Sequence, residues 1–212
     1  MSESTIRPPQ QRRSRESFDR VLEAGADLLR EAGFEGFTLQ EVSRRAGVSI
    51  GAMYARAPSK DALVLAIYDR EMERITSRQQ QIEADSHREG LTGRELVETL
   101  VRDMAELMLS ESATLRVFME RAVTDKAIWE RGAQRSQILA GVFETALLEH
   151  RDEFSHPDPE VAIDVAYRFV YCTLARRITH GPHFESEREL ADDRLVGELA
   201  TAAADYLLAT RQ

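Results

Sequence analysis

The chain has 212 residues, and 42% of them are hydrophobic, which is enough to fill the core of a small domain joined to a larger one. It has no run of about eighteen apolar residues and no apolar leader, which excludes a transmembrane helix and a secretory signal. We therefore expect a cytoplasmic protein without a membrane partner. The single cysteine, Cys172, excludes an internal disulfide and every multi-thiolate metal site, and we expect it to be buried in an apolar helix.

The net charge of -9 is unevenly distributed along the chain. Residues 1–61 hold 10 Lys and Arg against 9 Asp and Glu, whereas the rest of the chain holds 18 against 28. The acidity therefore belongs to the C-terminal part and does not exclude nucleic acid as a partner of the N-terminal part. The basic residues of the N-terminal part form two clusters: Arg7, Arg12, Arg13 and Arg15, and then Arg44, Arg45, Arg56 and Lys60. Charge alone favours the simpler interpretation, in which these residues form two solvated polar faces.

The first 14 residues are predicted to be a basic flexible arm, which either enters a DNA minor groove or binds nothing. A first helix is predicted over residues 15–32, where apolar residues recur at steps of three and four, and Gly33 is a natural end for it. Thr38 and Glu41 have the spacing of a capping box, in which each side chain accepts a hydrogen bond from the other residue's amide. They predict a short second helix that ends at about Ala46.

A glycine-containing turn at residues 47–49 leads to a third short helix, predicted from Ile50 to about Ala57. Pro58 and Ser59 then end and restart the helical chain, and a long fourth helix carries an apolar stripe to Ile75. The polar residues 77–94 are expected to fray or bend. Beyond them the spacing of apolar residues stays helical, and no segment alternates like a strand.

These patterns predict an all-α protein with an N-terminal three-helix helix-turn-helix domain and a C-terminal helical bundle. We place the helix-turn-helix domain at residues 15–60 and the bundle at residues 61–212. In such a unit the first short helix braces the second against the DNA major groove. Ala46 is small enough to let the two helices approach, Gly47 makes the turn, and Val48 anchors it. Ser49 is expected to cap the helix that begins at Ile50, whose exposed N-terminal amides can bind a phosphate. Helix-turn-helix spacings of this kind also occur in plain helical bundles.

Three short motifs stand together in this region: Ala46-Gly47-Val48-Ser49, Gly51-Ala52-Met53-Tyr54 and Ser59-Lys60-Asp61-Ala62-Leu63. In this order and spacing the sequence resembles the DNA reader of the TetR family of regulators, over about 50 residues. The remainder resembles that family only in length and helicity. One position departs from the pattern: the family usually has an aromatic residue just before the Ser-Lys step, where this chain has Ala57-Pro58. Phe34, Phe37 or Tyr68 would have to fill that space.

The resemblance implies roles for individual residues of the reader. Those implied to hold phosphates are Thr38, Ser49, Tyr54 and Lys60. Those implied to face base edges or the groove wall are Ile50, Gly51, Ala52 and Arg56. A glycine inside a helix costs roughly 1 kcal/mol relative to alanine, which is easier to explain if bare backbone must approach DNA at Gly51. Arginine reads guanine through two hydrogen bonds, which suits Arg56. Arg44 and Arg45 are expected to add contacts to the DNA backbone.

The resemblance also implies a ligand pocket and a four-helix dimer interface in the C-terminal part. Pocket candidates are apolar or adaptable side chains: Met104, Met108, Phe118, Trp129, Phe143, Tyr167 and Tyr171. Interface candidates are stripes of small and branched residues on the last two helices: Ala162, Ala166, Val170 and Thr173, and Val196, Leu199, Ala200, Ala203 and Leu207. Both sets fit ordinary core positions as well.

The resemblance therefore implies a homodimeric repressor that leaves a palindromic DNA operator when a small apolar or amphipathic ligand binds. We expect no cofactor, no metal site and no catalytic activity, because the chain has no nucleophile-base set, phosphate loop or metal-binding helix motif. The alternative is a helical protein that sequesters a ligand or binds a partner and whose DNA reader has weakened.

Overall fold

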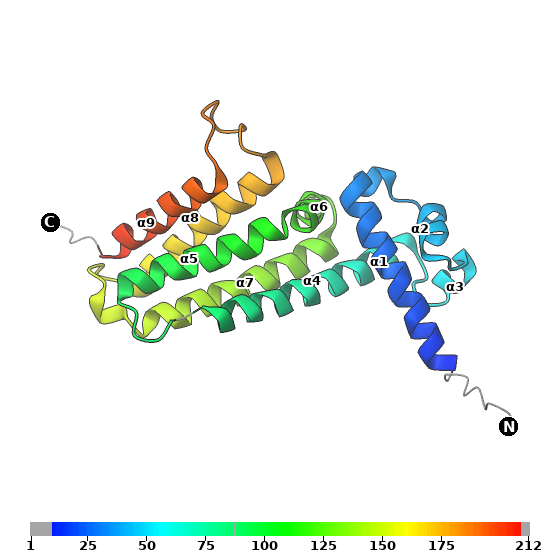
Figure 1. Cartoon of the computed structure of the whole chain (residues 1–212), viewed down its shortest axis with the longest axis horizontal. Helices are drawn as coiled ribbons and strands as arrows, with labels where there is room; N and C mark the ends of the chain where they lie inside the picture. The colour runs from blue at the N-terminus through cyan, green and yellow to red at the C-terminus, as the bar shows by residue number, and fades with distance from the viewer. Residues whose placement is uncertain (1–9, 87, 209–212) are drawn as a thin grey trace, which may run out of the picture. The chain divides into compact units, whose positions relative to one another are not determined.

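The computed structural model describes residues 10–86 and 88–208, all of whose regular elements are helices (Figure 1). The residues divide into two compact units, one up to Arg74 and one from Ile75 onward. The division falls inside a long helix, whereas the sequence placed the domain boundary at its start. In the described part of the chain, no helix is both long and apolar enough to cross a membrane.

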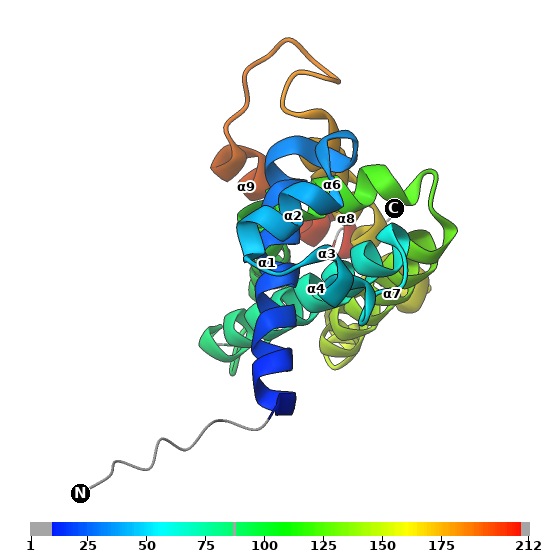
Figure 2. The same cartoon turned by 90° about the vertical axis from the view of Figure 1, so that its right-hand side faces the viewer.

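The first unit contains α1 (Gln10–Gly36), α2 (Leu39–Ala46), α3 (Ile50–Tyr54) and the first part of α4 (Lys60–Asp85). Figure 2 looks onto α2 and α3, which lie beside α1. The core of this unit is built from the apolar stripes that the sequence predicts, and its fully buried side chains include Val21, Leu29, Phe37, Val42, Leu63 and Ile67. Because these residues come from three helices and a connection, the core fixes the helix-turn-helix pair to α1 and α4.

Two helix boundaries in this unit differ from the sequence prediction. The first helix begins at Gln10, so Arg12 and Arg13 are helical and do not belong to a flexible arm; residues 1–9, with Arg7, lie outside the described residues. At its other end, Gly33 takes a φ of 62°, which breaks the regular helix where the sequence predicted an end. At the start of α4, the Ser59 hydroxyl accepts a hydrogen bond from the Ala62 amide at 3.0 Å, as its place in the sequence suggested.

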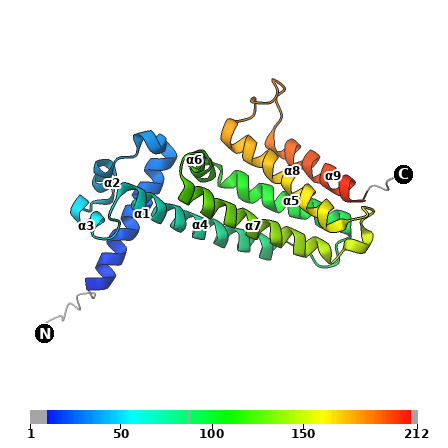
Figure 3. The same cartoon turned by 180° about the vertical axis from the view of Figure 1, so that it is seen from behind.

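The second unit contains the rest of α4 and α5 (Gly93–Ser110), α6 (Ser112–Ala122), α7 (Lys126–Leu148), a short 3₁₀ turn (Arg151–Glu153), α8 (Pro159–His180) and α9 (Asp192–Leu208). α5, α8 and α9 pack side by side, and α6 and α7 cover α8 (Figure 1). The loop at residues 181–191 extends beyond the ends of α8 and α9 (Figure 3). The core of this unit is rich in alanine where α8 and α9 meet, which lets their backbones approach closely.

Cys172 is exposed, so the prediction that it is buried is wrong. α8 buries the face that carries Ile163, Val170 and Leu174, and Cys172 lies on another face of the same helix. A run of mainly apolar residues has no period of its own that tells the buried face from the exposed one, which explains the error.

Candidate DNA-binding surface and ligand cavity

The α2–turn–α3 unit has the caps and the turn that its sequence predicts. The Thr38 hydroxyl accepts a hydrogen bond from the Glu41 amide at 3.2 Å, and the Ser49 hydroxyl accepts one from the Ala52 amide at 3.3 Å. Between the two helices Gly47 takes φ 64° and ψ 33°, the left-handed conformation that costs glycine least. The Ser43 hydroxyl closes the turn by donating to the Val48 carbonyl at 2.7 Å.

The pair of helices has a buried face and an exposed one. Val42 and Ala46 of α2 and Met53 of α3 are buried against the rest of the unit. The exposed face of α3 and its cap consists of Ser49, Gly51, Ala52 and Tyr54, and Ile50 beside them is half-buried. A methyl group added to Gly51 would meet no atom within 4 Å, so internal packing gives no reason for a glycine there.

Glu41 does not complete the predicted capping box. Its carboxylate binds two arginines of α2, and its contacts to the Nε atoms of Arg44 and Arg45 are both 2.8 Å. The Arg44 guanidinium, followed by that of Arg45, lowers the pKa of Glu41 to about 2. Arg45 also bridges to Glu31 of α1 at 2.8 Å. The two arginines predicted to contact the DNA backbone are therefore held by carboxylates, and Arg44 is the more exposed of the two.

Arg56 lies beyond α3, because α3 ends at Tyr54 rather than near Ala57 as predicted. The amides of Arg56 and Ala57 both bond to the Met53 carbonyl, which closes the last turn before Pro58, a residue that disfavours helix in its predecessor. The Arg56 guanidinium donates to the Ser14 hydroxyl at 2.6 Å and lies 5.5 Å from the centre of the Phe18 ring. The side chain is exposed, but it rests on α1 instead of projecting from α3.

Lys60 is also engaged within the protein. Its Nζ donates to the Phe37 carbonyl at 2.7 Å and lies 5.4 Å from the centre of the Phe37 ring. Ala57 itself is buried, and of the three aromatic residues expected to fill the space near it, Phe37 and Tyr68 are buried and Phe34 is half-buried.

Sequence reasoning missed Arg20, which positions α2 from α1. Its Nε donates to the Ala46 carbonyl at 3.3 Å, where a cation also meets the negative end of the α2 dipole. Arg20 and Ala46 are 26 residues apart, and no local pattern links them.

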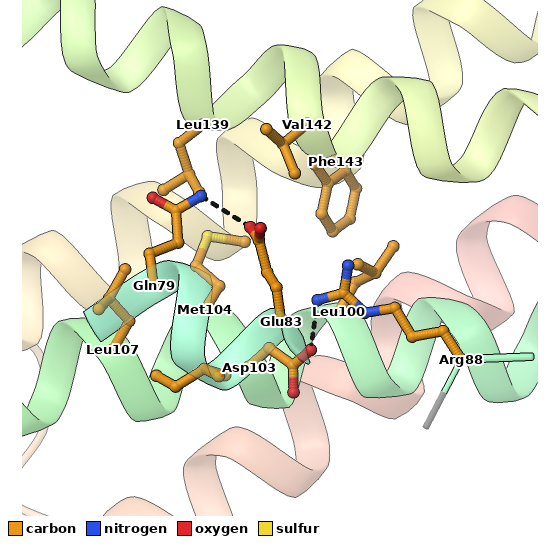
Figure 4. Close-up of a pocket in the computed structure, with 11 residues that line it drawn as sticks. Gln79, Glu83, Arg88, Leu100, Asp103, Met104, Leu107, Leu139, Val142 and Phe143 are labelled. Carbon is orange, nitrogen blue, oxygen red and sulfur yellow. Dashed lines mark hydrogen bonds and ion pairs between the residues drawn. The ribbon is translucent and has the colours of Figure 1, made fainter. Parts of the chain in front are cut away.

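A small cavity of about 30 Å³ lies in the second unit, between the last turns of α4 and the helices α5 and α7 (Figure 4). Its lining is mainly apolar, with four polar side chains: Gln79, Glu83, Arg88 and Asp103. Of the seven residues predicted for the pocket, Met104 and Phe143 line it. Trp129 does not line this cavity, and its side chain is 59% exposed. Met108, Phe118 and Tyr167 are core residues that do not line this cavity, and neither does the half-buried Tyr171.

The predicted interface stripes on α8 and α9 face the core of their own subunit. The six residues that are fully buried there are Ala162, Ala166, Val170, Ala200, Ala203 and Leu207. They have no free surface to offer a second chain, so the interface prediction is wrong for them. The three remaining candidates, Thr173, Val196 and Leu199, are half-buried.

A glycine-cornered pair of capped helices, anchored on one face and open on the other, is a helix-turn-helix unit, and the chain is a helix-turn-helix protein. Residues 21–67, which hold this unit, match the family described as "Bacterial regulatory proteins, tetR family". The N-terminal part of the chain thus carries a DNA-binding unit of the type found in the TetR family of transcriptional regulators.

Named relatives agree with this assignment. The HTH-type transcriptional regulator CymR of Pseudomonas putida is 29% identical over 133 residues, which are 63% of this chain and 64% of CymR. The HTH-type transcriptional repressor KstR of Rhodococcus jostii is 39% identical over 59 residues, 28% of each chain. The matches thus span less than two thirds of the length of these relatives.

Solved structures share the fold along almost the whole chain. A TetR transcription regulator from Haloarcula marismortui has a TM-score of 0.68 at 17% identity, and the match covers 93% of this chain and all of that one. Salmonella enterica GusR has a TM-score of 0.65 at 18% identity, with 95% and 98% covered. At these identities the likeness is one of fold.

Proposed function

We propose that the protein is a sequence-specific DNA-binding regulator that acts in the cytoplasm as a homodimeric repressor. The observation that carries this proposal is the open face of α3. Gly51, Ala52 and Tyr54 are exposed there, while Met53 on the opposite face ties the helix to the core. A short helix held rigidly on one side and bare on the other fits the major groove of DNA.

Hydroxyl and basic side chains around this face supply phosphate contacts. Thr38 and Ser49 present hydroxyls at the two helix starts, and Tyr54 adds a third at the end of α3. Arg44 and Lys60 are exposed and keep donors beyond those used inside the protein. Contacts of this kind set affinity and position, whereas discrimination between bases comes from the residues of α3.

A dimer would present two such helices to successive turns of DNA, roughly 34 Å apart. Because the stripes first considered are internal, we assign the interface to the outer face of α8. Val161 is 51% exposed and Val165 is 38% exposed, and Cys172 is exposed on the same side of the helix. Val161, Val165 and Cys172 lie on one face of α8 at spacings of four and seven, with the exposed Arg168 between them, and this partly apolar face suits packing against a second copy.

Release from DNA is assigned to a ligand bound in the second unit, at the cavity between α4, α5 and α7. α4 begins in the first unit, directly after the helix-turn-helix pair, and ends at this cavity, so a ligand that shifts its last turns would act on a helix shared by both units. A ligand that binds more tightly to the arrangement of α4 that is unfavourable for DNA binding lowers DNA affinity. The decrease is at most the ratio of the ligand's affinities for the two arrangements.

Electrophoretic retardation of the DNA that flanks the protein's own coding region tests the proposal. We expect a specific complex whose affinity falls steeply with salt, because phosphate contacts release counterions. Arg44→Ala should weaken binding to all sequences. Arg102→Ala is the matched control, since Arg102 is also exposed and paired with a nearby glutamate, but lies on α5. Absence of specific retardation would contradict the proposal and favour a ligand-sequestering protein.

A further inference from the structure

Arg88, in the connection between α4 and α5, lines both a cavity and a surface groove of the second unit. The cavity has a volume of about 30 Å³, and the groove has a volume of about 600 Å³. Val142 is the other residue common to both linings. The rest of the groove is lined by Leu96, Ile138, Gly141, Thr145, Ala146, Glu149 and His150. Arg88 and Val142 therefore border both a cavity too small for an organic ligand and a groove of ordinary ligand size.

The guanidinium of Arg88 is only partly satisfied. Its terminal nitrogen Nη2 contacts Asp103 at 2.6 Å, as Figure 4 shows. Its Nε is buried and, within the described part of the chain, has no hydrogen-bond acceptor. A buried donor without an acceptor is costly, so this atom is a place where a bound oxygen would be favoured.

The charges around Arg88 limit what kind of oxygen that is. Two carboxylates line the same cavity, Asp103 and Glu83, and the Glu83 carboxylate accepts a hydrogen bond from the Gln79 amide at 2.8 Å. A carboxylate ligand would add a third negative charge beside one arginine. A cationic ligand would approach a fixed guanidinium. An uncharged oxygen avoids both repulsions.

We propose that Arg88 anchors the regulatory ligand, and that this ligand is an uncharged apolar molecule with a hydroxyl or carbonyl oxygen that accepts a hydrogen bond from Nε. This inference rests on the proposed function, because it names the ligand class of the site assigned to regulation there. The apolar part lies against Leu100, Met104 and Phe143. A hydroxyl has the further advantage that its proton can be donated to Glu83.

The cavity has room for about one water molecule, so a ligand would need more space and would enter from the larger groove. Two of the side chains that would have to move are Met104, which is flexible, and Val142, which lines both spaces. Displacement of Val142 would open the cavity toward the groove while Arg88 keeps its contact with Asp103, and the entering ligand would move the last turns of α4, to which Gln79 and Glu83 belong. Entry of the ligand and the shift of α4 are thus one event.

Isothermal titration of the full chain with four probes of one shape tests the ligand class. The probes are 2-phenylethanol, phenylacetate, 2-phenylethylamine and ethylbenzene, which differ in charge and in the presence of oxygen. We expect the alcohol to bind at least about tenfold more tightly than each of the others, equivalent to about 1.4 kcal/mol. Equal or tighter binding of phenylacetate, equal binding of ethylbenzene, or no binding of any probe would overturn the proposal.

Substitution of the anchor tests the residue. Arg88→Met should abolish the preference for the alcohol over ethylbenzene, and Arg88→Met with Asp103→Asn should do the same without leaving a charged Asp103 unpaired. Arg78→Met is the control, because Arg78 makes a similar 2.7 Å ion pair to Glu106 of α5 but lines neither space. An unchanged preference in the double variant would contradict the assignment of Arg88.

Operator retardation, measured on the same variants without ligand, separates this inference from the function on which it rests. If the wild-type chain binds DNA but shows no preference for the alcohol over the other probes, the proposed ligand class or anchor is wrong, whereas the proposed function as a DNA-binding regulator still holds. If specific DNA binding is absent in the wild-type chain, the proposed function itself fails.

Discussion

At the scale of single residues, the two glycines of the helix-turn-helix unit differ in why a glycine is present, and Gly51 is not required by the fold. It lies in a short helix, where glycine is unfavourable, and a Cβ there would project into open space. Gly47 is the opposite case, since its φ of 64° belongs to the turn itself. The sequence could place both glycines in the motif, but only coordinates distinguish a glycine required by the backbone from one that folding does not need.

Gly51→Ala is expected to leave the fold intact, to stabilise it by up to about 1 kcal/mol, and to weaken operator binding. The added methyl would occupy space that DNA needs. Thermal unfolding and retardation assays measure the two effects on one sample. Gly141→Ala is the control, because Gly141 also lies in a helix, α7, where an added methyl group would meet no atom within 4 Å. Undiminished operator affinity in Gly51→Ala would mean that α3 does not approach DNA closely.

Arg56 is resting on α1, so its role depends on whether it leaves that position in the complex. If it reads a base, Arg56→Ala should reduce discrimination at one position of each half-site by about 1–3 kcal/mol. Ser14→Ala, which removes its 2.6 Å partner, should leave discrimination unchanged or improve it. Competition with single-base operator variants measures this. Similar losses of stability in both variants, with discrimination intact, would make Arg56 a structural link between α1 and α3.

At the scale of elements, α2 shows why a capping motif predicts a helix start more securely than it predicts contacts. Thr38 caps α2 as expected, whereas the Glu41 carboxylate faces two arginines one turn along and binds them. Charge-assisted contacts at i+3 and i+4 compete with the reciprocal cap. The box that does form, Thr92 with Glu95 at the start of α5, lies in a segment expected to fray, although its spacing was present in the sequence.

Glu41→Gln should raise the affinity of the protein for DNA of any sequence and steepen its salt dependence. The change removes a negative charge from the DNA side and releases Arg44, while Arg45 keeps Glu31. Retardation of non-operator DNA over a salt series measures both effects. Glu31→Gln, which loosens Arg45 alone, should have the smaller effect. Equal or reduced affinity in Glu41→Gln would show that the carboxylate positions the arginines productively.

The same carboxylate gives α2 a defined pH dependence. The folded pKa of Glu41, about 2, is below its ordinary value of 4.5, so its contribution to stability is present above pH 4.5 and is lost as the pH falls toward 2. We expect the unfolding temperature of Glu41→Gln to fall less than that of the wild-type chain across this range. Parallel melting profiles between pH 5 and pH 2 would contradict the assignment.

At the scale of the whole molecule, the sequence predicted the all-helical fold and the reader but not the faces used by the C-terminal helices. The apolar period of a helix marks a face that is buried, and it does not say whether the neighbour is the same chain or another. Ala162, Ala166 and Ala203 were assigned to a partner and lie inside the subunit, against α5 and between α8 and α9. Arg88 was missed for a related reason, because an orphaned donor exists only once the packing around it is known.

The outer face of α8 makes the dimer proposal testable without disturbing the fold. Val165 is 38% exposed in a single chain, so Val165→Glu costs little before association, whereas a glutamate pair buried between two copies would be strongly unfavourable. Sedimentation equilibrium should show a dimer for the wild-type chain and a monomer for this variant. The operator affinity of the variant should be lower, because the dimer is lost. Val123→Glu is the matched control, since Val123 is 84% exposed at the end of α6. A Val165→Glu variant that remains dimeric would place the interface on another surface, whereas a monomeric variant with full operator affinity would show that one reader suffices.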